Sequence, residues 1–190
     1  MHMKYFGDSY DLVKLSLIGW LRPFGDWSVH PMLTEKATPE EILAFECFLD
    51  APLISTEVLS ATTDRKAYLS CATQAGNLFL DPDTGLRMKS ASPQRNPEYL
   101  FLAELVEIVS ARPESLTLVF DQSLPRGSEP AALMKKLHHL LAEGVHTFAY
   151  VSHACFVVAG CDKELIDKAL THVRSESRLP ANRFLVPTGA

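Results

Sequence analysis

The chain has 190 residues, of which 47% are hydrophobic and 22% are charged, and its net charge is −5 at pH 7. No apolar run approaches the roughly 20 residues that a membrane-spanning helix needs. The four cysteines form no C-x-x-C pair, and the acidic balance argues against a broad nucleic-acid-binding surface. We therefore predict one cytoplasmic domain over residues 1–190, with its thiols reduced.

The first elements along the chain are a helix and a short strand. The segment 10–21 is rich in apolar residues; Gly7-Asp8-Ser9 offers caps before it, and Arg22-Pro23 ends it. This pattern predicts a helix over 10–21. The following WSVHPML (27–33) favours a short strand, and its proline places that strand at an edge of the sheet or ends it early.

A second helix has the clearest start signal in the chain. Thr38 is a good N-cap, Pro39 suits the first helical position, and Glu41 completes a capping box, so a helix is predicted to about residue 49. Residues 51–76 are ambiguous. PLIST is compatible with a strand, and the stretch ending at Gly76 with a helix or a second strand, of which we prefer the helix.

From residue 77 onward, strand and helix patterns alternate. We predict strands over 77–81, 115–121, 146–152 and 155–160, and helices from Asn96-Pro97-Glu98, over 129–143 and over 162–175, with a polar loop at 81–96 and an extended tail. The last two strands are too close together for a crossover helix and are therefore antiparallel. This order predicts a three-layer, Rossmann-like α/β fold with a mostly parallel sheet and an antiparallel strand near the C-terminus.

Polar residues follow three of these strands. Asp81 and Asp83 follow the first, Asp121 and Ser123 the second, and His153 the third. The first two strands are joined by a right-handed crossover, so their ends should meet at one edge, where open α/β sheets bind ligands. The alternative is that Asp and Ser only turn the chain there.

This convergence suggests a metal-dependent enzyme that acts on a phosphate ester, in a small molecule or in nucleic acid. Asp81, Asp83 and Asp121 would bind Mg²⁺ or Mn²⁺ through their oxygens, and His153 would act as a general acid or base. Asp81, Asp121 and His153 are thus the predicted catalytic residues.

Positive charges near the acids would suit a phosphate-bearing substrate. Lys14, Ser123 and Arg126 are the predicted substrate-binding residues, and Arg87, Lys89 and Arg95 would surround the acidic centre. For Lys14, the alternative is an ordinary ion pair with Asp11, three residues earlier in the helix.

The strand end Asp81-Pro82 also resembles the D-P-P-Y motif of S-adenosylmethionine-dependent amino-methyltransferases. The order strand, helix, strand, helix, hairpin is similar to the second half of that fold. The resemblance implies an S-adenosylmethionine site. However, Asp83-Thr84 replaces the proline–aromatic pair, and no glycine follows the first predicted strand of the chain, at 27–33. It therefore implies a degenerate relative of those enzymes.

Two motifs together resemble a family of uncharacterised bacterial and phage-associated proteins. They are Tyr5-Phe6-Gly7-Asp8…Tyr10-Asp11…Lys14 and Phe79-Leu80-Asp81-Pro82-Asp83…Gly85-Leu86, followed by Lys89-Ser90 and Tyr99-Leu100. This resemblance implies an α/β fold and supplies no activity. A non-enzymatic interaction module, whose strand ends only cap turns, therefore stays open beside the two enzyme hypotheses.

Overall fold

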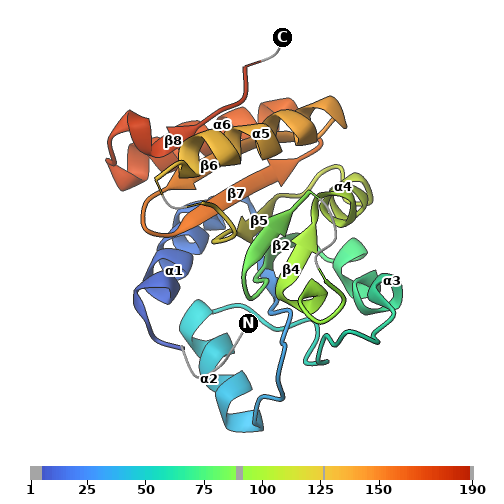
Figure 1. Ribbon diagram of the computed structural model, residues 1–190. Coiled ribbons are helices and arrows are strands. Elements are labelled where there is room, and N and C mark those ends of the chain that lie inside the picture. Colours follow the sequence, from blue (N-terminus) through green and yellow to red (C-terminus); the bar gives the residue numbers. More distant parts are fainter. Residues whose placement is uncertain (1–5, 89–91, 126, 189–190) are drawn as a thin grey trace.

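The computed structural model describes residues 6–88, 92–125 and 127–188, and its centre is a six-stranded sheet (Figure 1). Across the sheet the strands are β1 (Trp27–His30), β2 (Asn77–Leu80), β5 (Thr117–Phe120), β7 (Cys155–Gly160), β6 (His146–Val151) and β8 (Phe184–Leu185). The neighbours β1, β2 and β5 are parallel, whereas β7 is antiparallel to both β5 and β6, and β8 is antiparallel to β6. Because β6 thus runs in the direction of β5, most of the strands point the same way, as predicted.

Helices cover both faces of this sheet, which confirms the predicted three-layer α/β fold. One face carries α1 (Ser9–Leu21), α2 (Pro39–Leu49) and α6 (Lys163–Ser177), and the other carries α3 (Arg65–Tyr68), α4 (Leu102–Ser110) and α5 (Glu129–Ala142). Side chains alternate between the faces along each strand. In β2, for example, Phe79 belongs to the first core and its neighbours Leu78 and Leu80 to the second. None of the helices in the described parts of the chain is long and apolar enough to cross a membrane.

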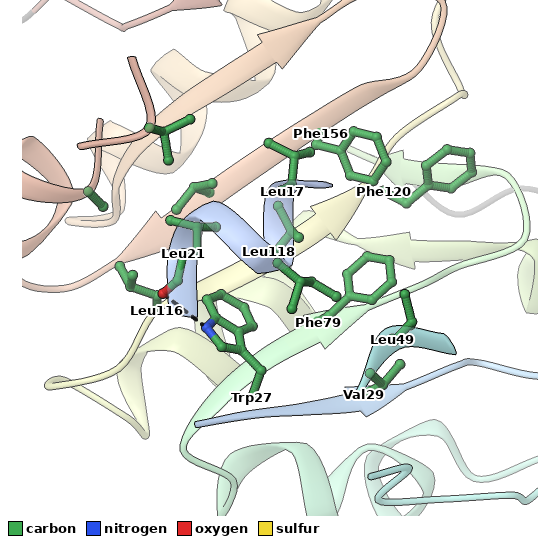
Figure 2. Packing of buried hydrophobic residues seen from close by; sticks show 14 of the residues in the cluster. Leu17, Leu21, Trp27, Val29, Leu49, Phe79, Leu116, Leu118, Phe120 and Phe156 are labelled. Atoms are coloured by element: carbon green, nitrogen blue, oxygen red, sulfur yellow. Dashed lines mark hydrogen bonds between the residues drawn. The ribbon is translucent and has the colours of Figure 1, made fainter. Parts of the chain in front are cut away.

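Large aromatic side chains fill the core under α1 (Figure 2). The Trp27 indole donates a hydrogen bond to the Leu21 carbonyl oxygen over 3.3 Å, which ties the last turn of α1 to the start of β1. Phe156 lies between the rings of Phe79 and Phe120, at centroid distances of 6.5 and 5.4 Å. Burial of these rings supplies most of the attraction between α1 and the sheet.

Several predicted helix boundaries are confirmed by their capping contacts. The Thr38 hydroxyl accepts a hydrogen bond from the Glu41 N–H, and the Glu41 carboxylate accepts one from the Thr38 N–H. Asp162 likewise caps α6 by accepting from the Glu164 N–H. These local pairs explain why both helices begin where the sequence indicates.

The predicted loop over 81–96 and the predicted helix from Asn96 are both wrong in detail. β3 (Gly85–Arg87) pairs in parallel with β4 (Tyr99–Phe101) to form a separate two-stranded sheet, called the small sheet below. A 3₁₀ turn occupies 96–98, and α4 begins only at Leu102. The cause is tertiary: the Arg65 guanidinium bonds the Tyr99 carbonyl oxygen and the Glu104 carboxylate, which holds residues 99–101 extended.

Residues 51–76 contain less regular structure than the preferred helix. Asp64 caps the four-residue helix α3, and a 3₁₀ turn follows over 70–73. The PLIST segment forms only an isolated bridge, between Leu53 and Val29, along the outer edge of β1. The tail is extended, as predicted, apart from a 3₁₀ turn over 181–183, and β8 lies within it.

His30, the last residue of β1, is buried beside Tyr68. Its Nδ1 accepts a hydrogen bond from the Met32 N–H over 3.3 Å, so its Nε2 carries the proton and faces the Tyr68 carbonyl oxygen. Burial lowers the pKa of His30 from 6.5 to about 4. The unfolded chain therefore takes up a proton at a higher pH than the folded chain does.

We expect His30 to weaken the fold in acid. Its contribution to stability is complete above pH 6.5 and falls as the pH drops towards 4, by about 2 kcal/mol between pH 7.5 and 5.0. Urea unfolding of wild type and His30→Gln at both pH values tests this, because the variant should lose about 2 kcal/mol less over that interval. His138→Gln, at an exposed position on α5, should follow wild type. Parallel curves for wild type and His30→Gln would contradict the expectation.

Candidate functional site

The carboxyl ends of β2 and β5 meet at one edge of the sheet, as predicted, and the carboxyl end of β1 lies beside that of β2. His30 ends β1, Asp81 directly follows β2, and Asp121 directly follows β5. The Asp81 N–H donates to the His30 carbonyl oxygen over 3.1 Å, and the Asp121 N–H donates to the Cys155 carbonyl oxygen over 2.8 Å. Both aspartate side chains are almost completely buried, at 1% and 0% exposure, yet their surroundings differ.

Asp81 belongs to a buried group of three charges, called the Asp11–Lys14–Asp81 triad below. The Lys14 ammonium lies 2.8 Å from an Asp81 oxygen and 2.9 Å from an Asp11 oxygen. The second Asp11 oxygen accepts a hydrogen bond from the Gly7 N–H over 2.7 Å. Asp8 caps α1 by accepting from the N–H groups of Tyr10 and Asp11. The start of α1 is thereby fixed against the end of β2.

Burial and charge act against each other within the triad. Burial would lower the pKa of Lys14, but the carboxylates of Asp81 and Asp11 outweigh it and raise that pKa. Burial raises the pKa of Asp81, and the ammonium of Lys14 offsets only part of the rise. Lys14 therefore stays charged, while Asp81 binds a proton more readily than an exposed aspartate does.

A series of ring contacts leads from the triad to the surface. The Lys14 ammonium lies 5.1 Å from the centroid of the Phe120 ring, and the Tyr10 ring packs on Phe120 and on His153 at 5.9 and 5.2 Å. His153 is exposed, and its carbonyl oxygen accepts a hydrogen bond from the Gln122 amide over 2.7 Å. The structure thus brings His153 near the triad through Tyr10.

Asp121 belongs to a different cluster, which holds the small sheet against the end of β5. Its carboxylate lies 2.6 Å from the Lys136 ammonium, 2.7 Å from the Ser123 hydroxyl and 3.0 Å from the Leu86 N–H, which donates to it. The same ammonium donates to the Leu86 carbonyl oxygen over 2.7 Å. We call these residues the Asp121–Lys136 clamp. Every group in it has partners inside the protein, so its evident role is structural.

The metal centre predicted from Asp81, Asp83 and Asp121 is not supported by this geometry. Asp81 and Asp121 each face a lysine ammonium at 2.8 and 2.6 Å, in the place where a cation would have to bind. Within residues 6–88, 92–125 and 127–188, no group of three or more His, Cys, Asp or Glu side chains could hold a metal ion. Asp83 is half-buried in the turn after β2.

The structure does not bring the predicted substrate-binding residues together in one cluster. Lys14 lies in the triad and Ser123 in the clamp, whereas Arg126 and Lys89 fall outside the described residues. Lys136 was missed, although it falls with Leu133, Leu137 and Leu140 on the buried face of α5. Its position among apolar residues at helical spacing is the signal by which the sequence could have revealed it.

Comparison with family models, with curated protein sequences and with solved structures finds no match for this chain.

The clamp requires glycine at position 85. Its φ is +133°, and a Cβ atom there would lie 2.4 Å from an Asp121 oxygen, 2.7 Å from the Asp121 Cα and 2.8 Å from the Gln122 nitrogen. We expect Gly85→Ala to lower the free energy of unfolding by at least about 2 kcal/mol, since backbone atoms cannot move aside. Gly144→Ala is the control, because φ is +80° there but the space is open, and it should cost about 1 kcal/mol. Equal urea midpoints for the two variants would refute the steric explanation.

Removing the ammonium from the triad should leave two buried carboxylates without a counter-charge. We expect Lys14→Met to destabilise the protein by about 3–5 kcal/mol. Adding Asp81→Asn should recover part of that loss, because one of the unpaired charges disappears. Lys163→Met, which breaks an exposed pair with Asp167, should change the midpoint of urea unfolding little. Additive effects of Lys14→Met and Asp81→Asn would show that the triad is not coupled.

Proposed function

We propose that the protein is an enzyme that transfers protons to or from a phosphate-bearing substrate at the carboxyl edge of the sheet. In this proposal Asp81 is the acid–base group, Lys14 and Asp11 hold it in place, and no metal ion is needed. The observation that carries the proposal is the Asp11–Lys14–Asp81 triad, buried at the edge where open α/β sheets bind ligands.

Stability alone does not account for this triad. Transferring charges from water into a protein interior costs several kcal/mol per ion, and apolar replacements of buried ion pairs are often as stable. Carboxyl groups with a raised pKa collect at sites that move protons. The raised pKa of Asp81 supports such a role, because it brings the carboxyl closer to neutral pH.

The charges also indicate which part of a substrate would meet Asp81. Two carboxylates and one ammonium give the triad a net charge of −1, and the carboxylate of Asp8 lies at the same end of α1. A phosphate would be repelled here, whereas a hydroxyl or amino group that donates a hydrogen bond would be favoured. The phosphate of the substrate therefore binds away from the triad.

In this proposal the substrate approaches Asp81 from the exposed end of the series of ring contacts. Lys14 is only 5% exposed, whereas Tyr10 and Gln122 are half-buried and His153 is exposed. The proposed substrate therefore contacts these three side chains at the surface of the edge. In this proposal His153 is the second proton-transfer group, because it lies at the exposed end of the ring contacts.

Three alternatives are a metal-dependent reaction, methyl transfer and a non-enzymatic interaction module, and the experiment described below distinguishes them from the proposal. A metal-dependent reaction is disfavoured because lysine ammonium groups occupy the positions beside Asp81 and Asp121 where a metal ion would bind. Methyl transfer from S-adenosylmethionine is supported by the strand end Asp81-Pro82. It is opposed by the end of β1, where His30-Pro31 follows in place of the glycine that a cofactor loop needs. An interaction module would keep the triad as a purely structural element.

To test the proposal, the protein is incubated with mononucleotides and with short single-stranded RNA and DNA, and products are measured by mass spectrometry. Parallel reactions contain EDTA, Mg²⁺ or S-adenosylmethionine. We expect a product in EDTA without S-adenosylmethionine. Asp81→Asn should lower its rate by about 100-fold or more, because a positioned acid–base group contributes that much.

The control is Asp167→Asn, at an exposed position on α6, which should keep the wild-type rate. A product that needs Mg²⁺ would restore the metal hypothesis, and one that needs S-adenosylmethionine would restore methyl transfer. The absence of any product, or a rate that Asp81→Asn leaves unchanged in a folded variant, would refute the proposed function.

A further inference from the structure

Two arginines gather on one buried tyrosine of the small sheet. The guanidinium carbon of Arg87, on β3, lies 4.8 Å from the centroid of the Tyr99 ring, on β4, and that of Arg95 lies 5.7 Å from it. Tyr99 itself is only 4% exposed. Its ring therefore serves as a fixed support for two positive charges.

The two guanidinium groups differ in their remaining contacts. Arg95 donates to the Glu98 carboxylate over 2.9 Å and to the Tyr99 hydroxyl over 2.7 Å. Arg87 is half-buried, and among the residues that the structure describes, no carboxylate or carbonyl oxygen accepts a hydrogen bond from it. Stacking occupies the face of a guanidinium and leaves the N–H groups at its edge available. Arg87 is thus held in place by the Tyr99 ring, with donors that no described oxygen atom of the protein accepts.

Arg87 is also attached to the carboxyl edge of the main sheet. The residue before it, Leu86, donates its N–H to the Asp121 carboxylate over 3.0 Å, and the Gln122 N–H donates to the Thr84 carbonyl oxygen over 2.9 Å. Asp121 and Asp81 follow neighbouring strands. The small sheet therefore carries positive charge and is joined to the sheet edge at which the negatively charged triad lies.

We propose that Arg87, supported by Arg95, is the phosphate contact of the substrate that binds at the carboxyl edge. This inference rests on the proposed function, because the triad repels the phosphate that such a substrate carries. A planar guanidinium donates two parallel hydrogen bonds to phosphate oxygens, and this is the anion that its geometry fits best. The substrate would then lie across the edge, with its phosphate on the small sheet and a hydrogen-bond donor at Asp81.

Binding measurements with three probes test the inference and identify the source of the phosphate. The probes are inorganic pyrophosphate, AMP and a fluorescent twelve-nucleotide single-stranded DNA, each titrated against the full chain by calorimetry or fluorescence anisotropy. We expect at least one probe to bind wild type, and Arg87→Gln to weaken it about tenfold or more, since a hydrogen bond to a charged group is lost. Arg87→Lys should fall between the two, because it keeps the charge and loses the paired donors.

Arg174→Gln is the matched control. Arg174 also lies over an aromatic ring, at 5.5 Å from the centroid of Phe184, but belongs to α6. It should bind the probes as wild type does. If the DNA binds, Arg87→Gln should also reduce the slope of log affinity against log salt by about 0.7, the value for one lost contact to a single strand.

The inference is overturned if no probe binds wild type at millimolar concentration, or if Arg87→Gln binds as tightly as wild type and Arg174→Gln. The two proposals fail separately. Unchanged affinity in Arg87→Gln rejects the phosphate contact, whereas unchanged turnover in Asp81→Asn rejects the catalytic edge. Asp81→Asn should keep its affinity for pyrophosphate, which occupies only the phosphate contact, even where turnover is lost.

Discussion

One ammonium group, that of Lys14, determines how the first helix meets the sheet. Apolar packing holds α1 on its face of the sheet, but apolar contacts alone would let a helix slide along its axis. The bond from Lys14 to Asp81, beyond β2, fixes the axial position, and the bond from Lys14 to Asp11 within the helix holds the ammonium in place. The start of α1 consequently lies at the carboxyl edge, and Tyr10 lies over Phe120. The arrangement of polar groups at this edge depends on that placement.

The two strand-end aspartates look equivalent in the sequence but have different roles. Asp121 accepts hydrogen bonds from four groups, which are the Leu86 N–H, the N–H and hydroxyl of Ser123, and the Lys136 ammonium, and these join three parts of the chain. Asp81 is bound mainly through one lysine, and its pKa is raised by burial. The contacts of Asp121 hold the small sheet and α5 at the end of β5, which is a structural role. This contrast is why Asp81 carries the functional proposal and Asp121 does not.

The sequence predicts the fold better than it predicts the site. Helix caps such as Thr38 and Asp162 act locally, and the buried strands NLFL and TLVF each contain three consecutive apolar residues, so both can be identified from a short window. The β4 strand escaped prediction because Arg65, over thirty residues away, holds it extended. The lysine partners of the two aspartates are also remote from them in the chain, and Lys136 is 15 residues from Asp121. Lys14 is 67 residues from Asp81, and no periodic pattern reports such a pair.

The turn after β2 has a further consequence for how this chain can vary. Surface loops commonly tolerate gained or lost residues. Here the Gln122 N–H bonds Thr84, the Leu86 N–H bonds Asp121, and Gly85 lies against the backbone between them. An insertion or deletion within residues 81–84 would shift all three positions by one residue and turn the wrong side chain towards Asp121. Related proteins that share this architecture should therefore differ in the identity of residues in this turn but not in its length.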